Sequence, residues 1–282
     1  MKTWKTVAIV GVGLIGGSIG RALLHKKLAQ HVVGVGRDLR KLQRARRMGI
    51  VTEVSHDVEA GVREADLTVV CTPVASIVEH VLRVAAACPS GALITDVGST
   101  KSAIAAALQG KKRLGGATFV GSHPLAGSEK SGFENSRTDL LEGRIVIVTP
   151  SASAPESAVR RTVSFWRQLG AEVRRMSPRD HDRALAATSH LPHVIASALA
   201  ASTPAQVLTL AATGWSDTTR IASGDVRLWE QIVMQNRGHV LKSLDKFEKV
   251  LSSLRSSLES GNPRQLKTIL AKGKQHRDSV GS

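Results

Sequence analysis

The sequence predicts an α/β fold in which a mostly parallel sheet covered by helices is followed by an all-helical domain. Two observations carry this prediction. As far as residue 177, short β-branched runs alternate with amphipathic stretches, which is the pattern of βαβ units. After Ser177-Pro178 the strand-like runs stop, and an alanine- and leucine-rich helical pattern continues. We therefore divide the chain into a first domain over residues 1–177 and a second over 178–282.

The first domain contains seven strand candidates with helical segments between them. The strand candidates are residues 6–10, 32–35, 67–71, 92–96, 117–121, 145–149 and 171–175. The clearest helical segments are residues 17–27, 41–48 and 156–169. Because a helix between two strands returns the chain to the same end of the sheet, this alternation favours parallel pairing.

The second domain contains one long apolar stripe. Its members recur at spacings of three, four or seven residues, and they are Val226, Trp229, Val233, Val240, Leu244, Phe247, Leu251, Leu254 and Leu258. This spacing predicts a long helix with one apolar face, ended by Gly261-Asn262-Pro263. Such a stripe usually packs in a core, and its length also allows it to pack against a second subunit.

Composition narrows the classes of partner. The net charge is +16, but the basic residues are spread along the chain and aromatic residues make up 3%, too few for a base-stacking surface. We expect a solvated basic surface that binds no nucleic acid. The two cysteines indicate neither a disulfide framework nor a metal site. The N-terminal segment does not resemble a signal peptide and no apolar run is long enough for a membrane span, so we expect a cytoplasmic protein without membrane contact.

A glycine-rich turn, Gly11-Val12-Gly13-Leu14-Ile15-Gly16, follows the first strand and opens a helix. In that context Gly11 permits a tight turn, Gly13 lets the backbone approach a pyrophosphate, and Gly16 lets the helix pack close to the strand. The N–H groups at Leu14 and Ile15 would face the phosphates. The pattern predicts a bound dinucleotide; a tight turn without a ligand is the alternative.

The end of the second strand indicates which dinucleotide is preferred. NAD-binding proteins usually place an acidic residue there, but this chain has Gly36 followed by Arg37. An arginine can pair with the 2′-phosphate of NADP. We therefore expect NADP as the cofactor, with NAD as the alternative if Asp38 reaches the ribose.

Polar residues follow three other strand candidates, where ligands bind in open α/β sheets. The segments are Thr72-Pro73, placed on the cofactor side, then Asp96 to Lys101, and Ser122-His123-Pro124. An imidazole has the ordinary pKa, about 6.5, that suits a general base near neutral pH. His123 is therefore the candidate base for removing a hydroxyl proton during hydride transfer.

Four motifs give the sequence a family resemblance. The segment Ser122-His123-Pro124-Leu125-Ala126-Gly127-Ser128-Glu129-Lys130-Ser131-Gly132 resembles the signature of the prephenate/arogenate dehydrogenases of tyrosine biosynthesis. Three further stretches agree in type and order: Asp96-Val97-Gly98-Ser99-Thr100-Lys101, Ser189-His190-Leu191-Pro192-His193, and Thr219-Arg220-Ile221-Ala222 with Trp229 beyond. The resemblance implies a Rossmann domain followed by a helical domain that forms a homodimer, with active sites between the domains.

The resemblance also implies an activity and a set of roles. The activity is oxidative decarboxylation of prephenate, with arogenate as the alternative substrate. His123 would be the catalytic base, and Ser99 would hydrogen-bond either His123 or the substrate hydroxyl. Arg220 would bind a substrate carboxylate. The other implied substrate contacts are His193, Ser189 and Glu129, and no metal takes part.

Other interpretations stay open for several residues. Arg220 could form a surface or interdomain ion pair, and His190 could be structural or functional. His181-Asp182 could be a helix-start pair, the favoured interpretation, or a substrate contact. Trp229 is expected to pack rather than to catalyse.

Two alternatives concern the whole protein. One is a β-hydroxyacid or imine-type dehydrogenase with the same two-domain plan. The other is a non-catalytic dinucleotide-sensing or nucleic-acid-binding protein. One local departure also stands out, because Ser223-Gly224-Asp225 occupies the place where the family commonly has Ser-Asp-Pro.

Overall fold

The computed structural model describes residues 3–109, 115–127 and 132–280. Within these residues, six strands form one parallel sheet in the order β3-β2-β1-β4-β5-β6. The strands are β1 (Trp4–Val10), β2 (Ala29–Val35), β3 (Glu53–Ser55), β4 (Leu67–Val70), β5 (Leu93–Asp96) and β6 (Thr118–Phe119). This is the strand order of the dinucleotide-binding Rossmann fold, whose ligand crevice lies where the order reverses between β1 and β4.

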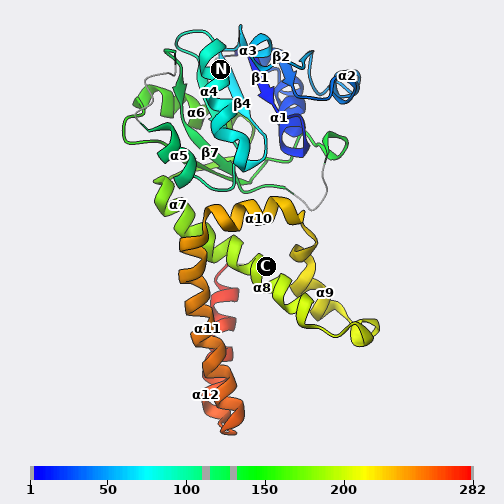
Figure 1. Cartoon of the computed structure of the whole chain (residues 1–282), viewed down its shortest axis with the longest axis vertical. Helices are drawn as coiled ribbons and strands as arrows, with labels where there is room; N and C mark the ends of the chain where they lie inside the picture. Colours follow the sequence, from blue (N-terminus) through cyan, green and yellow to red (C-terminus); the bar gives the residue numbers. More distant parts are fainter. Residues whose placement is uncertain (1–2, 110–114, 128–131, 281–282) are drawn as a thin grey trace.

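Helices cover both faces of this sheet (Figure 1). They are α1 (Leu14–His25), α2 (Leu39–Arg47), α3 (Val58–Val62), the 3-10 turn η1 (Val74–Ser76), α4 (Ile77–Ala87), α5 (Ser102–Leu108) and α6 (Glu156–Gln168). Alternate residues of β1 enter opposite cores, as the pleat requires. Val7 and Ile9 pack with α1 and α6, whereas Ala8 and Val10 pack with α3 and α4. The predicted α/β architecture is confirmed.

A second, smaller sheet was not predicted. It contains β7 (Gly121–Pro124), β8 (Ile145–Thr149) and β9 (Glu172–Arg175), and β7 pairs antiparallel with β8. The single strand expected at 117–121 is therefore wrong: the chain leaves the first sheet after Val120 and enters the second at Gly121. A Cβ at Gly121 would lie 2.8 Å from Thr149 Oγ1, so glycine allows this close crossing. The strand β3 was also missed, because its three residues, one exposed and two half-buried, form no apolar run.

The second domain is entirely helical. Its elements are α7 (Pro178–Leu185), a π-helical turn η3 (Ala186–His190), α8 (Leu191–Ser202), η4 (Ala205–Leu210), α9 (Thr213–Thr219), η5 (Arg220–Ser223), α10 (Val226–Gln235), α11 (Arg237–Glu259) and α12 (Pro263–Asp278). Ser177 begins α7 by accepting a hydrogen bond from the N–H of Asp180. Figure 1 shows α10 lying against the sheet domain, while α11 and α12 form an arm directed away from it.

The single long helix expected from the apolar stripe is wrong, because α10 and α11 are separated at Asn236. The backbone of Asn236 leaves helical geometry, and its side-chain amide donates to the Asp182 carbonyl and to His190 Nδ1. These tertiary bonds compensate for the break. The predicted end of the stripe is confirmed: Gly261 is left-handed, and Asn262 begins α12 by capping the N–H of Gln265.

Part of the stripe is uncovered in the single chain. Val226 is 79% exposed and Leu258 is 67% exposed. Among the described residues, one helical run, Pro178–Ser202, is long and apolar enough to cross a membrane by length and composition alone. Its first turns hold the buried polar residues His181 and Asp182 against the sheet domain, so this end is part of the folded interior.

Candidate active site

The glycine turn between β1 and α1 has the geometry expected of a phosphate cradle. Gly11 has φ +98°, and a Cβ there would lie 2.8 Å from the Cys71 carbonyl oxygen. A Cβ at Gly16 would lie 2.2 Å from the Gly11 carbonyl oxygen, whereas a Cβ at Gly13 would meet no atom within 4 Å. The first helical amides, at Leu14 and Ile15, receive no side-chain cap. Two glycines therefore allow close packing, and the third leaves open space before free helix-terminal N–H groups, which fits a pyrophosphate.

The residues beyond β2 and β4 flank this turn. Gly36 directly follows β2, and Arg37 is exposed beside it. Asp38 begins α2 by accepting from the N–H of Lys41 at 3.1 Å. On the other side, the amide nitrogen of Thr72 is 3.1 Å from the position of a Cβ at Gly11, and Pro73 leads into η1. The predicted cofactor residues thus gather around one turn.

A buried ion pair attaches the loop after β5 to β7. The ammonium of Lys101 contacts the Asp96 carboxylate and donates to the Ser122 carbonyl at 2.8 Å. Asp96 also accepts from the N–H groups of Gly98 and Ser122. Burial lowers the pKa of Lys101, although the Asp96 carboxylate acts in the opposite direction. This pair positions the loop that carries Ser99 next to the strand that carries His123.

His123 lies within β7, opposite Ile147, and not beyond the end of a strand as expected. Its side chain is buried, with 9% of the residue exposed, and Nδ1 is 2.9 Å from Nε2 of His181. Burial is the largest cause that holds the pKa of His123 well below 6.5, followed by positive charge on His181, Lys101 and His190. The imidazole is therefore neutral near pH 7, as a proton acceptor must be.

Ser99 is half-buried, and no hydrogen bond joins it to His123 among the described residues. Nδ1 of His123 is instead paired with His181. Of the two roles that the resemblance implies for Ser99, contact with the substrate hydroxyl is the one this geometry leaves open.

His193 stacks face to face on Trp229, with ring centroids 3.6 Å apart. Its Nδ1 is buried and has no partner within the described part of the chain, so this nitrogen is available to a ligand. Gly224 lies beside the pair, and a Cβ there would be 2.5 Å from Trp229 Nε1. The departure from Ser-Asp-Pro therefore has a local reason: glycine leaves room for the tryptophan, and Asp225 caps α10 through the N–H of Leu228.

The remaining predicted substrate residues lie around α8. Ser189 is half-buried in the π-helical turn η3, a kind of distortion that is frequent at functional sites. Arg220 begins η5, which packs against α8, and it is exposed. It forms no ion pair with any described residue, so the alternative interpretation, a surface or interdomain ion pair, finds no support. Glu129 lies outside the described residues.

Three contributors were not assigned to the site from the sequence. His181 and Asp182 were interpreted as a helix-start pair, but both are buried and Asp182 accepts a hydrogen bond from His181 Nδ1 at 2.8 Å. Asn236 lies between the apolar residues of the stripe. A polar residue at a buried position of an otherwise apolar face was the one feature of the sequence that could have indicated its role. In the described ranges, no cluster of three or more potential ligand side chains is arranged for a metal ion.

Comparison with known proteins agrees with this geometry. Residues 19–175 match the family model "Prephenate dehydrogenase, nucleotide-binding domain", and residues 177–272 match "Prephenate dehydrogenase, dimerization domain". A cyclohexadienyl dehydrogenase of Zymomonas mobilis is 34% identical over 92% of this chain and 90% of its own length.

Solved structures agree as well. A prephenate dehydrogenase of Aquifex aeolicus, in complex with hydroxyphenyl propionate and NAD+, is 30% identical with a TM-score of 0.89, covering 98% of each chain. The arogenate dehydrogenase of Synechocystis is 27% identical with a TM-score of 0.82, covering 98% of this chain and 99% of that one. With both domains matched, a phosphate cradle at one end and a buried imidazole between the domains, the chain belongs to the prephenate/arogenate dehydrogenase family of nicotinamide-dinucleotide-dependent oxidoreductases.

Proposed function

We propose that the protein is a prephenate dehydrogenase that uses NADP and converts prephenate to 4-hydroxyphenylpyruvate. The observation that carries this proposal is His123, a buried neutral imidazole at the junction of the two domains. It is the group in the site suited to accept a hydroxyl proton. A nicotinamide dinucleotide bound at the glycine turn supplies the hydride acceptor.

The chain's own residues then have distinct tasks. His123 accepts the proton of the ring hydroxyl while the hydride leaves the same carbon, and loss of carbon dioxide makes the ring aromatic. Ser99 orients the hydroxyl. Arg220 binds a substrate carboxylate, because its guanidinium is exposed and unpaired among the described residues and can donate bidentately. His193 Nδ1 and Ser189 contact the rest of the substrate.

The choice of prephenate over arogenate rests on charge. Prephenate is the more anionic of the two, because it carries a keto group where arogenate carries an amino group. A chain of net charge +16 attracts the more anionic molecule more strongly. Arogenate is the alternative substrate, and a solved relative is named for it.

The choice of NADP rests on the end of β2. Gly36 occupies the position where NAD-binding proteins usually have an acidic residue, and Arg37 is exposed beside it. The side chain of Asp38 accepts a hydrogen bond that caps α2. The exposed Arg40 and Lys41 add positive charge to the same helix terminus. These groups favour a 2′-phosphate over a 2′-hydroxyl.

We also propose that two copies associate through the helical domain. The match to a dimerization domain and the uncovered apolar side chains support this proposal. These side chains include Leu210, Val226, Met234, Leu241, Val250, Leu251, Leu258 and Leu270. The cytoplasmic location stays a prediction from the sequence, as does the expectation that neither membrane nor nucleic acid is bound.

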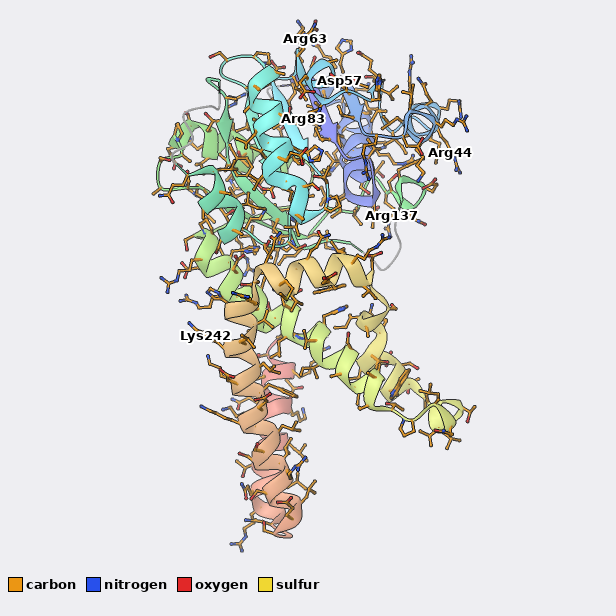
Figure 2. The ribbon with its side chains drawn as sticks, in the orientation of Figure 1. Arg44, Asp57, Arg63, Arg83, Arg137 and Lys242 are labelled. Atoms are coloured by element: carbon orange, nitrogen blue, oxygen red, sulfur yellow. The ribbon has the colours of Figure 1, made fainter. Side chains whose placement is uncertain are left out.

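The basic charge gives little support to the nucleic-acid alternative. Figure 2 shows the labelled Arg44, Arg63, Arg83, Arg137 and Lys242 on separate parts of the molecule. Three of these pair with carboxylates, as in the Arg83–Glu59, Arg137–Asp139 and Arg44–Glu134 pairs. A gel shift on DNA or RNA that weakens with salt, without any turnover, would favour this alternative.

The test of the proposed function is an assay of four combinations, prephenate and arogenate each with NAD and NADP. We expect reduced nicotinamide to form fastest from prephenate with NADP. Faster turnover of arogenate would transfer the assignment to the alternative substrate. The absence of reduced nicotinamide from all four combinations would overturn the proposed activity.

A further inference from the structure

Two side chains of the helical domain form a continuous hydrogen-bonded chain to His123. His181 and Asp182 lie on α7 and are 0% and 2% exposed. His181 Nε2 is 2.9 Å from His123 Nδ1, and His181 Nδ1 is 2.8 Å from Asp182 Oδ1. The order Asp182–His181–His123 therefore connects a carboxylate in one domain to the candidate base in the other.

Asp182 accepts hydrogen bonds at both of its oxygens. Oδ1 accepts from the N–H of Lys101, and Oδ2 accepts from the N–H of Ser102, each at 2.8 Å. Burial by itself raises the pKa of Asp182, but the hydrogen bonds from His181, Ser102 and Lys101 outweigh burial and lower the pKa overall. The group is therefore a carboxylate, which can accept hydrogen bonds but not donate them.

This carboxylate determines where the protons lie on both rings. Because Asp182 only accepts, Nδ1 of His181 must carry a hydrogen. A neutral His181 then has a lone pair at Nε2, which accepts from Nδ1–H of His123. His123 Nε2 is left with a lone pair, and that nitrogen is the one able to take a proton.

Charged and titratable groups from both domains surround the two rings. The buried Lys101 ammonium and His190 both act on His123, and the nearby carboxylates are Asp96, already paired with Lys101, and Asp182. A hydrogen on His181 Nε2 would reverse the bond to His123 and, in a neutral His123, place the ring hydrogen on Nε2.

We propose that His181 and Asp182 are positioning residues for the base. They hold His123 in the Nδ1–H tautomer, keep its Nε2 free to accept the substrate proton, and provide an acceptor for Nδ1–H once the imidazole becomes positively charged. The inference rests on the proposed role of His123 and deepens it. It assigns part of the catalytic apparatus to α7, so His123 is correctly protonated only when the helical domain is docked.

The tautomer is measured in the wild-type protein, and a variant is needed only to assign the signals. Two-dimensional ¹⁵N–¹H spectra of the histidine-labelled protein at pH 7.5 distinguish protonated from unprotonated ring nitrogens. His123→Asn identifies the His123 signals by their loss. We expect a protonated Nδ1 and an unprotonated Nε2 on His123, and a protonated Nδ1 on His181. A hydrogen on His123 Nε2 in the wild-type protein would overturn the inference.

Turnover separates positioning from general stability. In His181→Leu the acceptor is lost, and we expect kcat to fall on the order of 10- to 100-fold, a part of what a general base contributes. KM for prephenate and the affinity for NADPH should change by no more than about twofold, because the side chain of His181 is completely buried. His181→Gln keeps a carbonyl oxygen that can accept from Nδ1–H, so it should recover most of the lost kcat.

The matched control is Leu185→Ala on the same helix. Leu185 is buried and lies outside the hydrogen-bonded chain, so its variant should lower the melting temperature and leave kcat near the wild-type value. An equal loss of kcat in Leu185→Ala and His181→Leu would show that α7 matters only for packing. Wild-type kcat in His181→Leu would also overturn the inference.

Two results distinguish this inference from the proposed function. If the wild-type protein turns over neither substrate, the proposed function fails and the tautomer spectrum still tests the inference. If His123→Asn is inactive while His181→Leu is fully active, the proposed function holds and the inference fails. Should His181→Leu not fold, the spectrum of the wild-type protein decides alone.

Discussion

Trp229 stacks on His193 with the two ring planes inclined by only 11°, so the tryptophan determines how the imidazole faces the site. Trp229 belongs to α10 and His193 to α8, so this contact also joins two elements of the helical domain. Trp229 packs, as expected from the sequence. It packs against a candidate substrate residue.

Gly224→Ala tests this stacking. The backbone of Gly224 is in an ordinary extended conformation that alanine adopts, so the effect comes from the added methyl group, which would lie 2.5 Å from Trp229 Nε1. We expect the indole to move, and KM for prephenate to rise about tenfold with a smaller change in kcat. Steady-state kinetics measure both. Gly214→Ala, where a Cβ meets no atom within 4 Å, is the control, and an unchanged KM in Gly224→Ala would contradict the assigned role of the stack.

His123→Asn tests the base. The amide cannot take up a proton at neutral pH, so we expect kcat to fall on the order of 10²- to 10⁴-fold. Affinity for NADPH, measured by fluorescence titration, should stay nearly unchanged, because His123 lies in the second sheet and not at the glycine turn. The exposed His31→Asn serves as the control. Nearly full turnover in His123→Asn would remove His123 as the base.

Arg37→Ala tests the cofactor preference. Loss of a charge-assisted hydrogen bond to a phosphate should weaken NADP binding on the order of 10- to 100-fold and NAD binding very little. Equilibrium titration with each reduced cofactor measures the difference. Arg47→Ala, an exposed change at the far end of α2, controls for the loss of one positive charge. An equal effect on both cofactors would show that Arg37 does not read the 2′-phosphate.

Two glycines of the turn should respond differently to alanine. Gly16→Ala places a methyl group 2.2 Å from the Gly11 carbonyl oxygen, so α1 must shift away from β1 and the melting temperature should fall by several degrees. Gly13→Ala meets open space, so stability should hold while dinucleotide affinity falls about tenfold as the methyl group enters the phosphate position. Calorimetry and cofactor titration separate the two effects. Unchanged affinity in Gly13→Ala would place the pyrophosphate elsewhere.

Acidification should destabilise the fold. Burial lowers the pKa of His123, His190 and His193, and it lowers the pKa of His190 from 6.5 to about 4. As pH falls below 6.5 the unfolded chain binds protons that the folded chain does not, so the free energy of unfolding decreases. For His190 the loss extends from pH 6.5 to about 4 and amounts to about 3 kcal/mol at most.

Urea denaturation at pH 7.5 and 5.5 measures this dependence. His190→Asn keeps an acceptor for Asn236 and removes the titrating group, so its unfolding free energy should depend less steeply on pH. The exposed His25→Asn should leave the dependence unchanged. A wild-type unfolding free energy that is independent of pH over this interval would contradict the assignment.

The features that could be predicted from the sequence are those determined by contacts between residues close together in the chain. The glycine turn could be located because Gly11 and Gly16 are required by close contacts within a few residues along the chain or next to the adjacent strand, and Gly13 is required by the open space before the helix. The end of α11, two residues before Gly261, is equally local. His123 could be selected because it follows an apolar run and lies in a motif that resembles a known family.

The features that were missed depend on contacts between distant segments. The chain changes sheets at Gly121 because of Thr149, which comes 28 positions later in the sequence. The helix break at Asn236 is compensated by hydrogen bonds to Asp182 and His190, and the spacing of apolar residues within a helix cannot predict these partners. The same holds for His181, whose function requires a partner from β7. The periodicity of apolar residues shows which face of a helix or strand is buried. It does not show which polar group of another element will contact that face.

The division of the first domain into two sheets has a consequence for the reaction. In the proposed mechanism the hydride and the proton leave the same C–OH group but go to different acceptors. The hydride acceptor is the dinucleotide bound at the six-stranded sheet, and the proton acceptor is His123 on β7. The buried pair of Lys101 and Asp96 spans the seam between them, since Asp96 ends β5 and Lys101 binds the Ser122 carbonyl. The Lys101 ammonium group thus determines the distance between the two sheets. The relative position of the hydride acceptor and the proton acceptor therefore depends on a residue that contacts neither the hydride nor the proton.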